Sequence, residues 1–389
     1  MPTGFAYLDA AATTPVEPGV VAVMLRYLYA DGLYANPSAT AHDFGLAAEA
    51  AINQARRDIA DALRCEPREI IFTSGATEAN NLALQGIAHA HAAKGRHLIV
   101  SAIEHKSVLA TADALARQGF NVSHLPPQPN GCVNPEDLAA LLRPDTLLVS
   151  LQHINNETGA VQPIEACAER LAAAGVLFHV DAAQSAGKFD LDLSQTPIDL
   201  LSLSAHKIHG PKGIGALIVK NRPRLRLQPI LYGGGQEYGL RPGTLPTHQI
   251  MGFAAALRIA CARRQTDHAH ASRLRRLFLE TLQTIGGFAL HGGPDRQSPY
   301  IVNFSIAGLD ADALINHLRP DIALASGAAC ASGAIEPSHV LRAMGLSGER
   351  LYGAVRASFH RHTTEAEVSH AAAKIRAVAA AFNAETPPP

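Results

Sequence analysis

The feature that most constrains the fold is a regular alternation of short apolar runs with amphipathic stretches between residues 69 and 219. Each apolar run has the length of a strand, and each stretch between two runs carries apolar residues at helical spacing. Strands that alternate with helices build a mostly parallel sheet, because each helical crossover returns the chain to the same end of the sheet. The predicted fold class is therefore α/β, with helices on both faces of the sheet. Strands are predicted at residues 70–72, 97–101, 147–151, 176–180, 200–203 and 216–219, and helices at 77–94, 106–118 and 164–174.

The pattern on either side of this region predicts a second unit. Helical spacing occurs at 17–30 and 42–63 ahead of the sheet, and a long helix is predicted from 248 to 285 behind it. After Gly286 and Gly287 the pattern changes to an α+β unit, with strands at 300–306, 323–326 and 355–358 and helices at 311–318 and 364–381. A chain of 389 residues is too long for one core of ordinary size. We therefore expect a large domain at 15–255 and a smaller α+β domain formed by 1–14 and 256–389.

The composition excludes several classes of protein. Hydrophobic residues make up 47% of the chain and charged residues 17%, which is typical of a globular protein and not of a disordered one. The 33 basic residues nearly cancel the 34 acidic ones, so no nucleic-acid partner is expected. No segment resembles a signal peptide or approaches the roughly 20 apolar residues of a membrane span, so we expect a cytoplasmic protein.

The five cysteines are scattered and contain no CxxC pair, which argues against a disulfide framework and a zinc knuckle. They are Cys65, Cys132, Cys167, Cys261 and Cys330. Two pairs of histidines, His89 with His91 and His268 with His270, lack the i, i+4 spacing of a helical ligand pair, so no metal site is predicted from them.

Polar residues follow the predicted strands, where open α/β sheets bind their ligands. After the first strand, Gly75 leads into a helix whose opening amides and Thr77 hydroxyl are suited to hold a phosphate, although Thr77 is equally suited to be a simple helix cap. His105 follows the second strand and is either a capping or hydrogen-bonding residue or a catalytic one. The segment 155–159 after the third strand has the composition of a turn.

Two further positions carry charge. Asp181 ends a very apolar strand, so its buried carboxylate must be paired, either as a helix cap or with a cationic ring nitrogen. Lys207 follows the strand at 200–203, where burial would lower the pKa of its amine and make it a Schiff-base nucleophile, while a surface charge is the plainer interpretation. The glycine-rich run 210–215 behind it favours a hairpin turn over a phosphate loop, because no helix follows.

Taken together, these positions supply phosphate donors, an aromatic ring, a buried carboxylate and a lysine at one edge of one sheet. Pyridoxal phosphate needs these contacts and few others, since the cofactor itself supplies the electron sink. The set as a whole therefore favours a site for this cofactor more strongly than any single residue does.

The chain resembles the NifS/IscS group of cysteine desulfurases, within the class V aminotransferase-like enzymes of fold type I. The resemblance rests on ordered motifs that run nearly from end to end: Tyr7-Leu8-Asp9, Ala11-Ala12-Thr13-Thr14-Pro15, Asn36-Pro37-Ser38, Phe72-Thr73-Ser74-Gly75-Ala76-Thr77-Glu78, Glu104-His105-Lys106-Ser107-Val108, Asn155-Asn156-Glu157, Asp181-Ala182-Ala183-Gln184, Ser204-Ala205-His206-Lys207, Gly233-Gly234-Gly235-Gln236-Glu237 and Ser326-Gly327-Ala328-Ala329-Cys330. The implied fold is a large pyridoxal-phosphate-binding domain with a smaller domain that carries the catalytic cysteine.

The resemblance also implies a role for individual residues. Lys207 would bind the cofactor as a Schiff base, Asp181 would hold the ring nitrogen, Gln184 would contact the phenolic oxygen and His105 would stack on the ring. The phosphate would be bound by Ala76, Thr77, Ser204 and His206, and by Thr244 of the other subunit, so a homodimer is implied. Asn156 and Arg356 would bind the carboxylate of the substrate, Arg356 by a bidentate contact.

The implied reaction takes sulfur from L-cysteine and releases L-alanine. Lys207 would move the α-proton, His105 would do acid–base work on the substrate thiol, and Cys330 would attack the sulfur as a thiolate to form a persulfide. A buried cysteine is usually inert, but the small, glycine-containing segment 326–336 predicts a mobile, exposed loop that carries Cys330 to an acceptor protein. This long loop resembles the IscS-like group more than the SufS-like group.

The chain departs from the usual pattern of the family at Ala329, Pro242 and Phe359-His360. Of these, Pro242 bears on the segment that presents Thr244 to the partner. The alternatives are a selenocysteine lyase or another class V enzyme, which need not keep Cys330, and a non-catalytic sulfur-relay scaffold, which need not keep Lys207. Three kinds of sulfur acceptor are compatible with the sequence: an iron–sulfur scaffold, a protein of tRNA thiolation and a protein of DNA modification.

Overall fold

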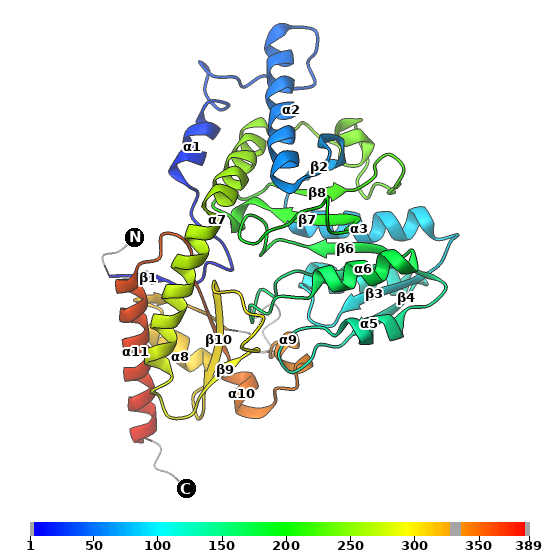
Figure 1. Cartoon of the computed structure of the whole chain (residues 1–389). Coiled ribbons are helices and arrows are strands. Elements are labelled where there is room, and N and C mark those ends of the chain that lie inside the picture. The colour runs from blue at the N-terminus through cyan, green and yellow to red at the C-terminus, as the bar shows by residue number, and fades with distance from the viewer. Residues whose placement is uncertain (1–3, 327–335, 386–389) are drawn as a thin grey trace.

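A seven-stranded sheet lies at the centre of the larger part of the molecule in the computed structural model, which describes residues 4–326 and 336–385 (Figure 1). The strand order is β2-β8-β7-β6-β5-β3-β4. The strands are β2 (Ile70–Thr73), β3 (His97–Ser101), β4 (Asn121–Leu125), β5 (Thr146–Gln152), β6 (Leu177–Asp181), β7 (Leu200–Ser204) and β8 (Gly215–Val219). The α/β prediction is confirmed.

The direction of these strands brings their carboxyl ends together. The strands from β7 to β4 pair in parallel, whereas β8 is antiparallel to both of its neighbours, β2 and β7. Because β2 is antiparallel to β8, it runs with the parallel strands, so only β8 runs against the rest of this sheet. The glycine-rich run 210–215 connects the antiparallel pair β7 and β8, as the hairpin interpretation predicts.

Helices cover both faces of this sheet. Successive side chains of a strand point to opposite faces, and those of the central strands are all buried. On one face, Leu98 and Val100 pack with residues of α3 (Ala76–His91) and α4 (Lys106–Arg117). On the other face, Ile99 belongs to a core shared with α2 (Asp43–Leu63), α6 (Ile164–Ala174) and the first half of α7 (Thr247–Leu282). The remaining helices of this part are α1 (Pro18–Leu25) and α5 (Pro135–Leu141).

The smaller part has its own core, built on a four-stranded sheet of order β12-β13-β10-β9. Its elements are β1 (Ala6–Tyr7), β9 (Phe288–His291), β10 (Ile301–Ile306), α8 (Ala311–Leu318), β11 (Ile322–Ala323), β12 (Ala325–Ser326), α9 (His339–Ala343), α10 (Gly348–Tyr352), β13 (Val355–Ser358) and α11 (Glu365–Glu385).

The helix α7 joins the two parts, which Figure 1 shows as a long helix running from the large sheet to α11. Phe253 at its start belongs to the core of the large sheet, and Phe278 near its end belongs to the smaller core, which also contains Leu8 from the N-terminal segment. The division at residue 255 stays a prediction. Among the described helices, none combines the length and the apolar character needed to cross a bilayer.

Two glycines in contact set the shape of the sheet edge where β2, β7 and β8 meet. A Cβ at Gly215 would lie 2.3 Å from the carbonyl oxygen of Leu203 and 2.7 Å from the Cα of Gly75. Gly75 itself has φ +151° with ψ −178°, a conformation that only glycine adopts readily. The absence of a side chain at Gly215 lets the turn that leads into α3 lie directly against the start of β8.

Gly215→Ala should therefore lower the free energy of unfolding by about 1–3 kcal/mol, because backbone atoms that cannot rotate away must shift. Denaturant unfolding monitored by circular dichroism measures the loss. Gly286→Ala is the matched control, since a Cβ there meets nothing within 4 Å. Equal stability of the two variants would contradict the close approach of Gly215 and Gly75.

Candidate active site

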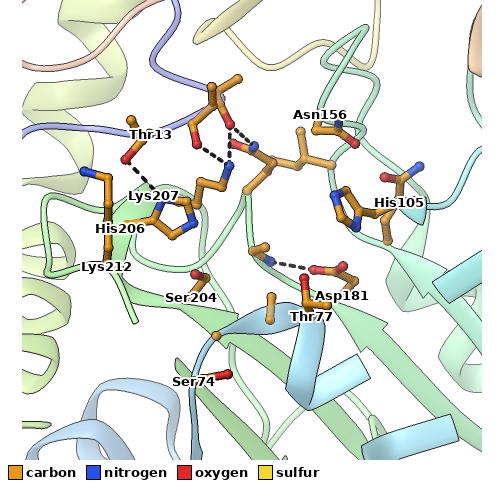
Figure 2. Close-up of a pocket in the computed structure, with 18 of the residues that line it drawn as sticks. Thr13, Ser74, Thr77, His105, Asn156, Asp181, Ser204, His206, Lys207 and Lys212 are labelled. Atoms are coloured by element: carbon orange, nitrogen blue, oxygen red, sulfur yellow. Dashed lines mark hydrogen bonds between the residues drawn. The ribbon is translucent and has the colours of Figure 1, made fainter. Parts of the chain in front are cut away.

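A cavity of about 630 Å³ opens at the carboxyl ends of the parallel strands (Figure 2). It is lined by the N-terminal segment, the ends of the strands and the turns that follow them, the first turn of α3, the turn ahead of β8, and the strand β13 of the smaller part. The lining residues are Ala11, Ala12, Thr13, Ser74, Gly75, Ala76, Thr77, His105, Gln152, Ile154, Asn156, Asp181, Ala183, Gln184, Ser204, His206, Lys207, Lys212, Gly213 and Arg356.

Lys207 lies on the short turn that follows β7, and its amine points toward the N-terminal segment (Figure 2). The Nζ atom donates hydrogen bonds to the carbonyl oxygens of Ala11 at 2.6 Å and Ala12 at 2.8 Å. Burial, helped by the positive charge of Arg356, lowers the pKa of Lys207 to about 8, against smaller opposing effects of Asp9 and Asp181. At pH 7 roughly a tenth of this amine is therefore neutral and nucleophilic, a far larger share than for an ordinary lysine.

Asp181 ends β6 and its carboxylate is buried, with 6% of the residue exposed. One oxygen accepts a hydrogen bond from the backbone N–H of Ala183 at 2.9 Å, and the other accepts one from the side chain of Asn80 at 2.7 Å. No ion pair of Asp181 is found within the described residues. Each carboxylate oxygen has a further lone pair, so Asp181 can accept a hydrogen bond from a protonated ring nitrogen.

The first turn of α3 forms the floor of the cavity. Gly75 is the N-cap residue of this helix and Thr77 is in its first turn, so the prediction of a helix cap at Thr77 is wrong and its hydroxyl is left to face the cavity. Ser204 and His206 reach the same region from the end of β7. Burial and the nearby Lys207 lower the pKa of His206 to about 4. Backbone amides at a helix start, together with two hydroxyls, are suited to bind a phosphate.

His105 is the N-cap residue of α4, and its ring faces the cavity (Figure 2). Its Nδ1 accepts a hydrogen bond from the backbone N–H of Ser107 at 3.1 Å, so this nitrogen is unprotonated and His105 does cap the helix. Burial lowers the pKa of His105 below its ordinary value, although the negative charge of Asp181 opposes this effect. The imidazole is therefore neutral at pH 7, with Nε2 as the nitrogen that carries the proton.

Arg356 crosses from β13 into the cavity. Its guanidinium donates a hydrogen bond to the carbonyl oxygen of Asn156 at 2.8 Å and forms an ion pair with Asp9 at 2.6 Å. The Nε atom is buried and has no partner among the described residues. A fixed guanidinium at the rim of a cavity is suited to bind a carboxylate.

The residues present fit pyridoxal phosphate. The amine of Lys207, the carboxylate of Asp181 and the phosphate donors of α3 line one cavity, and the ring of His105 faces the same space. The Oε1 atom of Gln184 is buried without a partner in the described part of the chain, while its Nε2 donates to the carbonyl oxygen of Ala11 at 2.8 Å. An unpartnered polar atom in such a place indicates that a ligand completes the site.

The structure brings together all of the predicted site residues except two. Thr244 is exposed and does not line the cavity of its own chain. Cys330, with its predicted loop, lies outside the described residues. The sequence reasoning missed Asn80, which holds both Asp181 and Ser107. Its signal is a polar residue, fully buried, among the apolar positions of α3.

Comparison with known proteins agrees with this geometry. Residues 6–370 match the model of the family "Aminotransferase class-V". The chain is 46% identical to the cysteine desulfurase IscS of Vibrio vulnificus strain YJ016, over 98% of this chain and 94% of the relative. It is 47% identical to the IscS of Pseudomonas putida strain F1, over 95% of this chain and 91% of the relative.

Solved structures give the same result. A NifS-like protein matches with a TM-score of 0.90 and 34% identity, covering 97% of this chain and 99% of that one. The structure of SspA in complex with cysteine matches with a TM-score of 0.82 and 38% identity, covering 92% and 100%. DndA from Streptomyces lividans matches with a TM-score of 0.79 and 42% identity, covering 91% and 99%. The chain therefore belongs to the class-V aminotransferase family and, within it, to the cysteine desulfurases of the IscS/NifS group.

Proposed function

We propose that this cysteine desulfurase binds pyridoxal phosphate in the cavity at the sheet edge, takes sulfur from L-cysteine and passes it on through Cys330. The observation that carries the proposal is the convergence of the Lys207 amine and the buried Asp181 carboxylate on one cavity. A lysine with a lowered pKa opposite a buried acid is what a Schiff-base cofactor with a cationic ring requires.

The cofactor would lie between the first turn of α3 and the amine of Lys207. Ala76, Thr77, Ser204 and His206 would hold its phosphate, Asp181 its ring nitrogen and Gln184 its phenolic oxygen, with His105 stacked on the ring. When bound, pyridoxal phosphate supplies an acceptor for the electrons of the substrate's Cα–H bond.

The substrate carboxylate would bind at Arg356 and Asn156. Arg356 is already held by the carbonyl oxygen of Asn156 and by Asp9, so its orientation is fixed before cysteine arrives. Binding to a fixed guanidinium loses less side-chain freedom than binding to a mobile one. This contact would set the orientation of the substrate's Cα–H bond toward Lys207.

The protein's own groups would then move protons and sulfur. The Nζ of Lys207 takes the α-proton of the substrate, and the imidazole of His105 exchanges a proton with the substrate thiol. The Cys330 thiolate attacks that sulfur, so the substrate's C–S bond breaks as the S–S bond of the persulfide forms. The balance is one L-cysteine and one enzyme thiol giving one L-alanine and one enzyme persulfide.

The family and the surface support the proposed partners. Large apolar side chains are exposed from α1 to the start of α2, at Val21, Leu25, Leu28, Tyr29, Tyr34, Phe44 and Leu46. Such a set is typical of a surface that is covered in an assembly, and it supports a homodimer in which Thr244 contacts the phosphate of the partner's cofactor. The name IscS of the relatives supports an iron–sulfur scaffold as the sulfur acceptor. A cytoplasmic location stays a prediction.

Replacing Cys330 with Ala should leave the visible absorbance of the bound cofactor intact and abolish the protein persulfide, because the attacking sulfur is gone. Lys207→Ala should lower alanine formation at least about 100-fold, the lower end of what a positioned acid–base group contributes. It should also prevent covalent trapping of the cofactor by borohydride. Alanine release, persulfide labelling and intact-protein mass measure the three effects.

Cys65→Ala is the control for the thiol, since burial and the nearby Glu69 raise the pKa of Cys65 to about 12 and keep it a thiol at neutral pH. Its desulfuration should match that of the unmodified protein. Persulfide formation in Cys330→Ala at the unmodified rate would refute the assignment of Cys330.

The rate at which the cofactor-free protein binds pyridoxal phosphate covalently should rise with pH to half its maximum near pH 8. The reason is that only the neutral amine attacks, and the pKa of Lys207 is lowered to about 8. Arg356→Gln removes a positive charge that contributes to this lowering, so the midpoint should move to higher pH. Stopped-flow absorbance over a pH series measures the midpoint.

Arg96→Gln is the matched control, because Arg96 is exposed ahead of β3 and its removal should leave the midpoint in place. A midpoint at the ordinary lysine value of 10.5 in the unmodified protein would contradict the proposed role of burial.

A further inference from the structure

A cluster of three histidines and one glutamate lies beside the turn that carries Lys207, where Lys207, His209 and His360 line one small pocket. The rings of His209, His360 and His362 contact one another, with centroids 5.2–5.9 Å apart. Ligand atoms of His209, His362 and Glu17 all lie within 4.8 Å of one another. The cluster is assembled from three segments that are far apart in the sequence, so no local spacing of residues predicts it.

His209 is buried, with 5% of the residue exposed, and one of its nitrogens is already committed. Its Nδ1 lies 2.9 Å from the carbonyl oxygen of Pro15, which can only accept, so Nδ1 carries the proton. The lone pair of a neutral His209 is therefore on Nε2. A ligating histidine usually donates its other ring N–H to a carbonyl or a carboxylate in this way.

Glu17 and His362 each have a ligand atom within 4.8 Å of a ring nitrogen of His209. The Nε2 of His362 lies 3.2 Å from Oε2 of Glu17, and the side chain of His362 is 46% exposed. Arg361 also contacts Oε2 of Glu17 at 3.2 Å, but its second terminal nitrogen is paired with Asp267 at 2.8 Å. The guanidinium charge is thus shared by two carboxylates, and within the described residues no hydrogen bond uses Oε1 of Glu17.

His360 orients the cluster and is not one of the ligands. Its Nδ1 accepts a hydrogen bond from the backbone N–H of His362 at 3.1 Å. The proton of a neutral His360 is therefore on Nε2, and the ring has no free lone pair. Its edge-on contacts with His209 and His362 fix the directions of those two rings.

We propose that His209, His362 and Glu17 form a binding site for a divalent transition-metal ion, with Zn²⁺ as the best fit. Two imidazole nitrogens and one carboxylate oxygen are a zinc ligand set, which leaves a fourth position for water. Tetrahedral bonds of about 2.0–2.1 Å bring ligand atoms to about 3.4 Å from one another. The exposed side chain of His362 can make the required approach, since it is the least constrained of the three.

The site would join three segments that also build the cavity. Glu17 follows Ala11 and Ala12, whose carbonyl oxygens hold Lys207, and His209 is two residues beyond Lys207. The backbone of Glu17 already donates to the carbonyl oxygen of His209 at 3.0 Å. His362 follows β13, which carries Arg356. The bound ion would therefore clamp the exit of β13 from the smaller part onto the turn that carries Lys207.

The test is zinc binding by the chelator-treated holoprotein, measured by equilibrium dialysis with metal analysis and by the shift of Tm on adding Zn²⁺. The unmodified protein should bind one more zinc per chain than Glu17→Gln or His362→Ala, and these variants should lose the rise in Tm. The affinity of the site should fall by more than about tenfold in each. His124→Ala, which removes an exposed histidine on β4, is the matched control and should behave like the unmodified protein.

None of these variants changes a cysteine, so any zinc bound by thiols is common to all of them. The difference in zinc stoichiometry between the unmodified protein and a variant therefore reports the histidine site alone. Circular dichroism of the metal-free variants shows whether they fold. We expect both variants to fold, because the side chains of His362 and Glu17 are not buried. Equal zinc stoichiometry and an equal rise in Tm in the unmodified protein and both variants would overturn the proposal. Zinc binding is measured independently of desulfuration. Loss of the zinc-site proposal would therefore leave the proposed function intact, and loss of the proposed function would leave the zinc site intact.

Discussion

The buried carboxylate of Asp181 is the constraint on which the arrangement of the cavity depends. Its strand, β6, is apolar and central, so the carboxylate is carried out of water at the sheet edge. Such burial costs several kcal/mol unless the charge is hydrogen-bonded and paired. Asn80 and the backbone of Ala183 supply hydrogen bonds but no positive charge. A cation can therefore bind beside this carboxylate. The proposed cofactor position puts the cationic ring of pyridoxal phosphate there.

Much of the fold was predictable because its strands are buried on both faces. The ranges 97–101, 164–174, 311–318 and 355–358 were predicted with the bounds that the structure has. The strand β4 was missed because it is an edge strand, and only Leu125 within it is buried, so it shows no continuous apolar run. The short α5 was missed because its length gives little periodicity. The strand β9 was missed for the same reason as β4, because it is a half-buried strand at the edge of its sheet.

The site was predictable where a residue directly follows a strand, and less so elsewhere. Thr77, His105, Asp181 and Lys207 all lie at the carboxyl edge of one sheet, so a rule about parallel sheets locates them without knowledge of the tertiary structure. Asn80 is a full turn inside a helix, and its contact with Asp181 depends on how α3 lies across the sheet. The histidine cluster depends on three separate segments. No local pattern contains the information that brings such groups together.

The N-terminal segment illustrates why tertiary contacts decide the chemistry. Leu8 belongs to the smaller core, and the next residue, Asp9, pairs with Arg356. The carbonyl oxygens of Ala11 and Ala12 then hold the amine of Lys207, and Thr14 donates a hydrogen bond to the carbonyl oxygen of His206 at 2.9 Å. One extended stretch thus fixes the proposed substrate-binding group and the proposed cofactor-binding group relative to each other. Since Arg356 also lowers the pKa of Lys207, the position of this stretch affects both the geometry and the reactivity of the amine.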